Sequence, residues 1–260
     1  MNGLQKYLAF ARIGAAGAVS ERGELLGRVL FFGVLLGVFS ALWRAVAEAG
    51  MPLEVEHHKL VWYLAATEWI LLSTPQRQHD IQEEVRRGDV AYQLARPVSF
   101  ARAQLAQGWG ALLVRAPMLG AAALLWVYLF TGSLPELCAL YWLGPFGLVA
   151  SAVLAQLFVA LGLLSFWLTD ATPLYWVANK LLFVLGGLML PLELYPEWLQ
   201  VVAGLTPFPA LLSEPAGFVL HGPATALALL PRLLLWAVLL FALVELLFWR
   251  ATRALQLNGG

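Results

Sequence analysis

Four ionisable side chains lie inside long apolar stretches of the sequence, where an isolated charge is costly. They are Glu68, Arg115, Lys180 and Glu245. Because two are acids and two are bases, we expect ion pairs, Glu68 with Arg115 and Lys180 with Glu245. In the alternative interpretation, Arg115 and Lys180 line a vestibule that opens to the cytoplasm and accepts an anionic headgroup. Both can hold if a substrate exchanges partners with a pair.

The residues that common catalytic and metal sites require are missing or badly spaced. The motif His-Glu-x-x-His, which holds a hydrolytic zinc ion, does not occur. Cys138 is the only cysteine, and the adjacent His57 and His58 would point in different directions on a helix. No lysine follows a glycine, so the loop Gly-x-x-x-x-Gly-Lys-Ser/Thr that binds ATP phosphates is absent. We therefore expect no catalytic residue, no metal and no cofactor in this chain.

The composition of the chain excludes several classes of protein. Of its 260 residues, 61% are hydrophobic and 12% are charged. Soluble domains average about 25% charged residues, so this chain has too few for a water-exposed surface or for a disordered state. Its 16 basic and 16 acidic residues give a net charge of +0, which argues against nucleic-acid binding. The long apolar runs favour an all-α, polytopic membrane protein that contacts the lipid bilayer.

The apolar runs predict six transmembrane helices, because a helix needs about 20 mostly apolar residues to cross a bilayer. The predicted spans are 25–47, 60–75, 106–130, a helix within 137–169, 173–190 and 224–249. We assign the whole chain, 1–260, to one transmembrane domain. No internal repeat relates the first three spans to the last three.

Lysine and arginine residues gather on one set of loops. They occupy the N-terminal segment, the loop after the second span and the C-terminus, whereas the opposite loops carry almost none. By the positive-inside rule both termini are cytoplasmic, in a multi-pass protein of the bacterial cytoplasmic (inner) membrane. Residues 1–24 are predicted to form a cytoplasmic interfacial segment, because Arg12 interrupts the apolar run too early for a signal peptide.

The polar segment 76–102 is the most informative loop. Asp80 suits the start of a short helix, Ile81 and Val85 share one face of it, and Gly88 suits its end. A second helical turn is expected before Arg96-Pro97 stops it. Apolar residues in a charged frame fit a docking element for a soluble partner. The alternative is a solvated connector whose charges hold the topology.

A proline-rich segment, 191–222, separates the last two predicted spans. Residues 195–202 suit a short amphipathic helix at the outer surface, with proline and acid near its start. The remainder is expected to enter the bilayer partly as a re-entrant segment, where its backbone must be covered by protein or line a cavity. The segment is either an outer gate or an interfacial cap. Its candidate gate residues are Pro191, Tyr195, Pro196, Trp198, Pro207 and Phe208.

Two of these segments resemble permease subunits of the type-2 ABC transporter family, in its short six-span subgroup. Residues 80–98, DIQEEVRRGDVAYQLARPV, are similar to the pattern I…E-I-x-x-G…L-x-R-P that follows the second span. Residues 186–199, GGLMLPLELYPEWL, followed by Thr206-Pro207-Phe208, are similar to G…P-x-x-x-x-P-x-x-L…P-F. The non-aromatic Val90 departs from the pattern. So does the short connection 169–172, which leaves a second cytoplasmic contact there unsupported.

The resemblance implies half of an ATP-driven exporter or flippase, which pairs with a second permease copy or a homologous permease. ABC ATPase subunits would dock from the cytoplasm and carry ATP and magnesium. The residues implied in coupling to them are Asp80, Ile81, Glu84, Val85, Arg87, Gly88, Tyr92, Arg96 and Pro97. An aromatic-rich body with few charges favours an amphipathic or lipid-linked substrate.

Two other functions fit the composition less well. A secondary transporter or channel would need a polar filter or an acid near the middle of the membrane, and Glu68 is the only candidate. A membrane enzyme would need clustered carboxylates on facing helices, but Asp80, Asp89 and Asp170 all lie at or outside the cytoplasmic surface.

Overall fold

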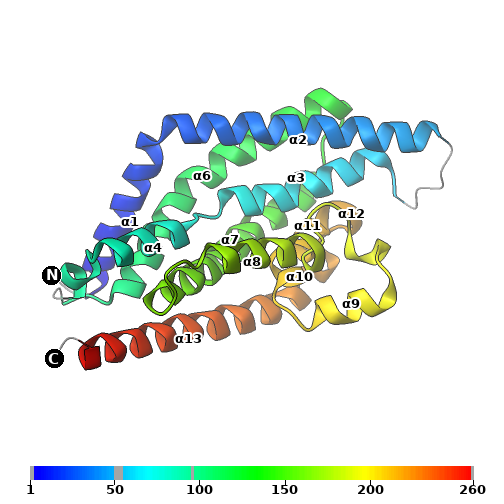
Figure 1. Ribbon diagram of the computed structural model, residues 1–260. Helices are drawn as coiled ribbons and strands as arrows, with labels where there is room; N and C mark the ends of the chain where they lie inside the picture. Colours follow the sequence, from blue (N-terminus) through cyan, green and yellow to red (C-terminus); the bar gives the residue numbers. More distant parts are fainter. Residues whose placement is uncertain (1–2, 50–54, 95–96, 259–260) are drawn as a thin grey trace.

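The computed structural model describes residues 3–49, 55–94 and 97–258, and every regular element in these ranges is helical. An all-α fold is therefore confirmed for this part of the chain. The long helices run roughly along one direction (Figure 1). Both termini lie at the same end as the short helix α4 (Arg77–Arg87), while α9 (Glu197–Gly204) lies at the opposite end.

Helices α1 (Gly3–Ser20) and α2 (Arg22–Glu48) meet at a sharp bend and pack along α6 (Phe100–Thr131). The crossing of α1 and α6 depends on two glycines. A Cβ on Gly14 would overlap the carbonyl oxygen of Gln107, and one on Gly110 would overlap that of Ala11. Only residues without a side chain let two helix backbones approach this closely.

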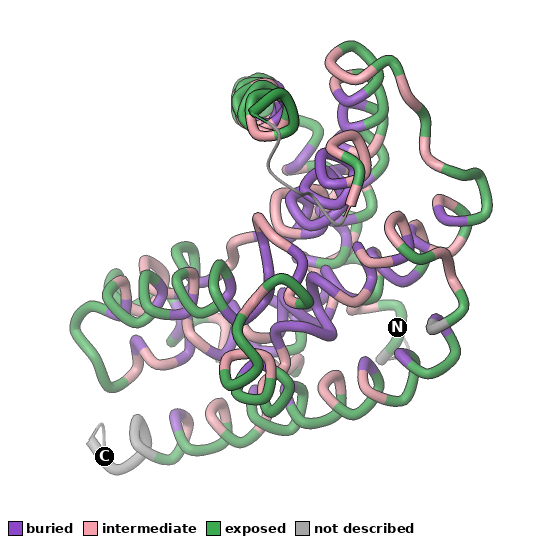
Figure 2. The backbone as a smooth tube through the Cα atoms, turned by 90° about the vertical axis from the view of Figure 1, so that its right-hand side faces the viewer, coloured by how far each residue is buried: buried purple, intermediate pink, exposed green. Residues whose placement is uncertain are grey.

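The interior is formed by α7 (Leu137–Leu163), which packs against α3 (His57–Ser73), α4, α6 and α13 (Ala226–Asn258). Its aliphatic and aromatic side chains, such as Leu154 and Phe158, are fully buried. Figure 2 shows the buried residues gathered in the middle of the molecule and exposed residues along the outlying helices. Those exposed faces are apolar, as a helix that meets lipid or another subunit requires.

Among the described residues, four helices are long and apolar enough to cross a membrane: α2, α6, α7 with its continuation to Phe166, and α13. The other two predicted spans correspond to α3, with 17 residues, and α8 (Thr172–Leu185), with 14 residues. At 1.5 Å per residue α8 is about 21 Å long, shorter than a bilayer core of about 30 Å. The short helices explain why length and composition alone support four spans.

The chain after α8 turns back through short elements that buried hydroxyl groups hold in place. The hydroxyl of Tyr63 donates to the carbonyl of Gly187 at 2.6 Å, and that of Thr67 donates to the carbonyl of Leu188 at 2.6 Å. Gly187 has φ 63°, which a residue with a side chain rarely adopts. The elements that follow are η2 (Leu192–Leu194), α9, α10 (Phe208–Leu211), α11 (Ser213–Ala216), α12 (Phe218–His221) and η3 (Pro223–Thr225).

Candidate functional site

The predicted helix of the polar loop is present, as α4, followed by α5 (Val90–Leu94). It begins at Arg77, one turn earlier than Asp80 indicated, and ends at Gly88 with φ 77°. The Gly88 amide hydrogen-bonds to the carbonyl of Val85 at 3.1 Å, and Asp89 to that of Glu84 at 3.0 Å, which closes the helix end. The last part of the predicted loop, 100–102, belongs instead to α6.

One face of α4 packs closely against α7. Ile81 is completely buried, and a Cβ on Gly162 of α7 would lie 2.9 Å from the Cα of Gln78 and 3.0 Å from the Cβ of Ile81. Val85 is partly buried against the same apolar cluster. The interpretation of Ile81 as an apolar contact for a docking partner is therefore wrong for this structure, because it holds α4 to the membrane helices.

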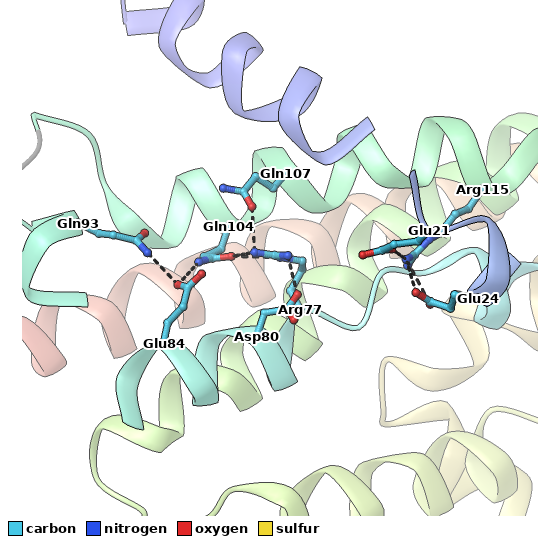
Figure 3. Close-up of polar contacts among 9 residues, drawn as sticks. All are labelled: Glu21, Glu24, Arg77, Asp80, Glu84, Gln93, Gln104, Gln107 and Arg115. Carbon is cyan, nitrogen blue, oxygen red and sulfur yellow. Dashed lines mark hydrogen bonds and ion pairs between the residues drawn. The ribbon is translucent and has the colours of Figure 1, made fainter. Parts of the chain in front are cut away.

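A second face of α4 is tied to α6 by a chain of hydrogen bonds (Figure 3). The Arg77 guanidinium donates to the side-chain oxygens of Gln104 and, at 2.9 Å, Gln107, and pairs with Asp80 at 2.6 Å. The amide of Gln104 donates to Glu84 at 2.8 Å. Burial raises the pKa of the Glu84 carboxyl despite the attraction of Arg77. Glu84 thus faces α6 rather than the surroundings.

The third attachment of α4 was not expected from the sequence. The Gln82 amide donates to Asp170 at 3.0 Å, and the backbone amide of Ala171 donates to the Gln82 oxygen at 3.2 Å. The rings of His79 and Tyr175 also meet edge to face, with centroids 5.0 Å apart. The connection between α7 and α8 therefore contacts the polar loop. Its one acid, Asp170, was the sequence signal for this contact.

The remaining face of α4 and α5 is open. Tyr92 is 77% exposed, and Arg87 and Gly88 are also exposed. Arg87 pairs with Glu83 one turn earlier at 2.7 Å, and hydrogen bonds to Arg86 and Arg87 hold the pKa of the Glu83 carboxyl below its usual value. Pro97 is exposed, while Arg96 lies outside the described residues.

The predicted pairing of the intramembrane charges is not the one observed. Arg115 pairs with Glu21 at 3.0 Å and Glu24 at 3.3 Å (Figure 3). Glu245 forms a two-pronged pair with Arg102, with both N–O distances 2.9 Å. The acids at the start of α2 and the arginine at the start of α6 reach these positions because helix crossings bring them there, which span-by-span depth estimates do not capture.

Glu68 and Lys180 are not joined to the bases and acids predicted for them. Glu68 is 4% exposed, and within ranges 3–49, 55–94 and 97–258 no side chain forms an ion pair with it. Lys180 is on an exposed side of α8, near the exposed Trp176 and Val177. The vestibule predicted from Arg115 and Lys180 together therefore does not form around these two residues.

Replacing Glu68 with glutamine is expected to leave the fold intact. No pair is lost, and the amide has nearly the shape of the carboxyl group, so we expect a change below about 1 kcal/mol in unfolding free energy. Thermal unfolding of the purified protein in detergent measures it. Glu245→Gln is the comparison and should cost more, because it removes the negative charge and one of the two acceptors that pair with Arg102. A larger loss for Glu68→Gln would show that the carboxylate has a partner.

The outer segment contains the short helix expected at 195–202, observed as α9. The candidate gate residues separate into two groups. Pro191 and Phe208 are buried, Tyr195 and Pro207 are partly buried, and Pro196 and Trp198 are exposed. A cavity of about 530 Å³ lies beneath the segment, lined by Tyr63, Pro191, Glu193, Glu214 and Arg232 among others. Glu193 pairs with His221 at 2.9 Å, and Glu214 pairs with Arg232.

A family profile described as "ABC-2 family transporter protein" matches residues 67–259, from the middle of α3 to the end of the chain. The match includes the α4–α5 loop and the outer segment. No curated protein sequence matches the chain.

Proposed function

Because the chain belongs to the ABC-2 family of transporter proteins and is thus a membrane-spanning permease component, we propose that it is half of an ATP-driven exporter or flippase. ABC ATPase subunits are the partners that this family implies. The observation that carries the proposal for this chain is the way in which α4 is attached to the membrane helices. Three of its attachments lead to α6, α7 and the α7–α8 connection, while its fourth side is open.

A helix attached in this way to several membrane helices is suited to transmit force to them. A soluble subunit that pushes on Tyr92 or Arg87 would move α4 together with the helices to which it is seated. Because the contact between α4 and α7 is close-packed, a displacement of α4 would pass to α7 and would not be absorbed locally. We assign docking to Tyr92, Arg87 and Gly88, and attachment to Ile81 and Glu84. ATP and magnesium would be bound entirely by the ATPase subunits.

The membrane topology that we propose has six crossings, both termini in the cytoplasm, and the bacterial inner membrane as the location. Helices α3 and α8 would complete the six. The termini share one end of the molecule with α4, which carries Arg77, Arg86 and Arg87. The positive-inside rule places such an end in the cytoplasm.

The exposed apolar residues of α8, including Trp176, Val177 and Leu181, fit contact with a second permease. The substrate that we propose is amphipathic or lipid-linked. Such a molecule would leave past the outer segment, where the 530 Å³ cavity combines Leu192 and Leu229 with the charged side chains of Glu214 and Arg232.

The docking assignment is tested with purified protein and its cognate ATPase reconstituted in liposomes. Tyr92→Ala and Arg87→Glu should each lower stimulation of ATP hydrolysis roughly tenfold, the loss of one central contact of about 1.4 kcal/mol. Tyr141→Ala is the matched control, because Tyr141 is 73% exposed at the start of α7, away from α4. Unfolding temperatures should not change. Full stimulation in both loop variants would overturn the docking assignment.

A further inference from the structure

A second cavity, of about 390 Å³, lies between α1, α2, α4 and α6. It is within the size range of small-ligand sites, about 300–1,000 Å³. The docking surface and the outer segment do not use it. Ile13, Gly17, Ala18 and Ala111 contribute apolar lining.

The basic side chains around this cavity are more deeply buried than the acidic ones. Three guanidinium groups form its inner wall: the side chains of Arg115, Arg28 and Arg77 are 9%, 15% and 18% exposed. Three carboxylates form its open edge: Glu21, Glu24 and Asp80 are 53%, 43% and 55% exposed. His79 also lines the cavity. A ligand would therefore meet positive charge inside and negative charge at the entrance.

The guanidinium group of Arg115 has a donor without an acceptor in the described part of the chain. Arg115 pairs with Glu21 and Glu24 through its Nη2 atom. Its Nε is buried without a hydrogen-bond partner in the described part of the chain. A buried N–H without an acceptor costs about 1–3 kcal/mol, and an oxyanion is the acceptor that a guanidinium binds best.

We propose that this cavity binds a phosphate–ammonium zwitterion, the headgroup chemistry of phosphatidylethanolamine. The phosphate would contact Arg115 and Arg28, and the ammonium group would lie among Glu21, Glu24 and Asp80. A ligand of either single charge would satisfy one set of side chains and be repelled by the other. A bound headgroup would also join α1 to α4, since both helices line the cavity.

Gly17 makes the site testable without removing any charge. It lines the cavity, and a Cβ there would meet no atom within 4 Å, so the side chain of Gly17→Leu can begin without a clash and extend into the space. Gly23→Leu is the matched control, because Gly23 is equally unobstructed and does not line the cavity. Both changes replace a helical glycine with a good helix former.

The experiment measures the unfolding temperature of delipidated protein in mixed micelles. We expect phosphatidylethanolamine to raise it by several degrees for the native protein and Gly23→Leu, and to have at most a small effect on Gly17→Leu. Phosphatidylglycerol, which lacks the ammonium, should stabilise less. Millimolar phosphoethanolamine distinguishes the source: stabilisation would support a soluble ligand, and its absence a lipid. Equal shifts in Gly17→Leu and native protein, or equal shifts with both lipids, would overturn the proposal.

Discussion

One methyl group at Gly110 is expected to detach α1 from the rest of the molecule. In Gly110→Ala the new Cβ would overlap the carbonyl oxygen of Ala11, so the two backbones must separate. Backbone atoms cannot adopt another rotamer to relieve such an overlap, and we expect a loss of about 3 kcal/mol or more of unfolding free energy. Gly14→Ala should have the same effect, because its Cβ would overlap the carbonyl of Gln107.

The measurement combines thermal unfolding in detergent with limited proteolysis of the N-terminal helix. Both variants should unfold at lower temperature, and cleavage within residues 3–20 should become faster. Gly27→Ala is the control, since a Cβ on Gly27 in α2 would meet no atom within 4 Å. A Gly110→Ala protein as stable as this control would show that α1 does not cross α6 at this point.

The local features of the α4 loop were readable from the sequence because they depend on neighbouring residues. Gly88 gave the end of α4, and Ile81 with Val85 gave its apolar face. What covers that face was not readable, since it depends on the absence of a side chain at Gly162, about eighty positions away. The same apolar pattern would suit a partner protein, which is why Ile81 was assigned to docking.

The predicted ion pairs, Glu68 with Arg115 and Lys180 with Glu245, were wrong for a related reason. Arg115 and Glu68 were paired because they lie at similar depths along their helices. Two residues at the same depth meet only if their helices turn those faces toward each other. The bend at Glu21 lets α1 cross α6 and brings Glu21 and Glu24 to the cavity wall. The bend is accompanied by close packing of α1 on α6 at Gly14 and Gly110. Predicting apolar spans one at a time does not reveal such a contact.

A methyl group at Gly162 is expected to separate ATP hydrolysis from transport. In Gly162→Ala the Cβ would lie 2.9 Å from the Cα of Gln78, so α4 must move away from α7. The hydrogen bonds of Glu84 to Gln104 and of Gln82 to Asp170 join α4 to other segments and would retain the helix near the bundle. The permease should therefore remain folded and bound to its ATPase, but the contact between α4 and α7 should be looser.

If α4 passes motion to α7 through this contact, Gly162→Ala should lower substrate movement per ATP hydrolysed roughly tenfold, the effect of weakening one critical contact by about 1.4 kcal/mol. Co-purification with the ATPase and the hydrolysis rate should change little. Gly144→Ala on the same helix is the control, since a Cβ on Gly144 would meet no atom within 4 Å. Unchanged transport per ATP in Gly162→Ala would mean that force passes by another contact, and the hydrogen bond of Gln82 to Asp170 would then be the next to break. Loss of both hydrolysis and co-purification would instead show that docking itself depends on the position of α4 against α7.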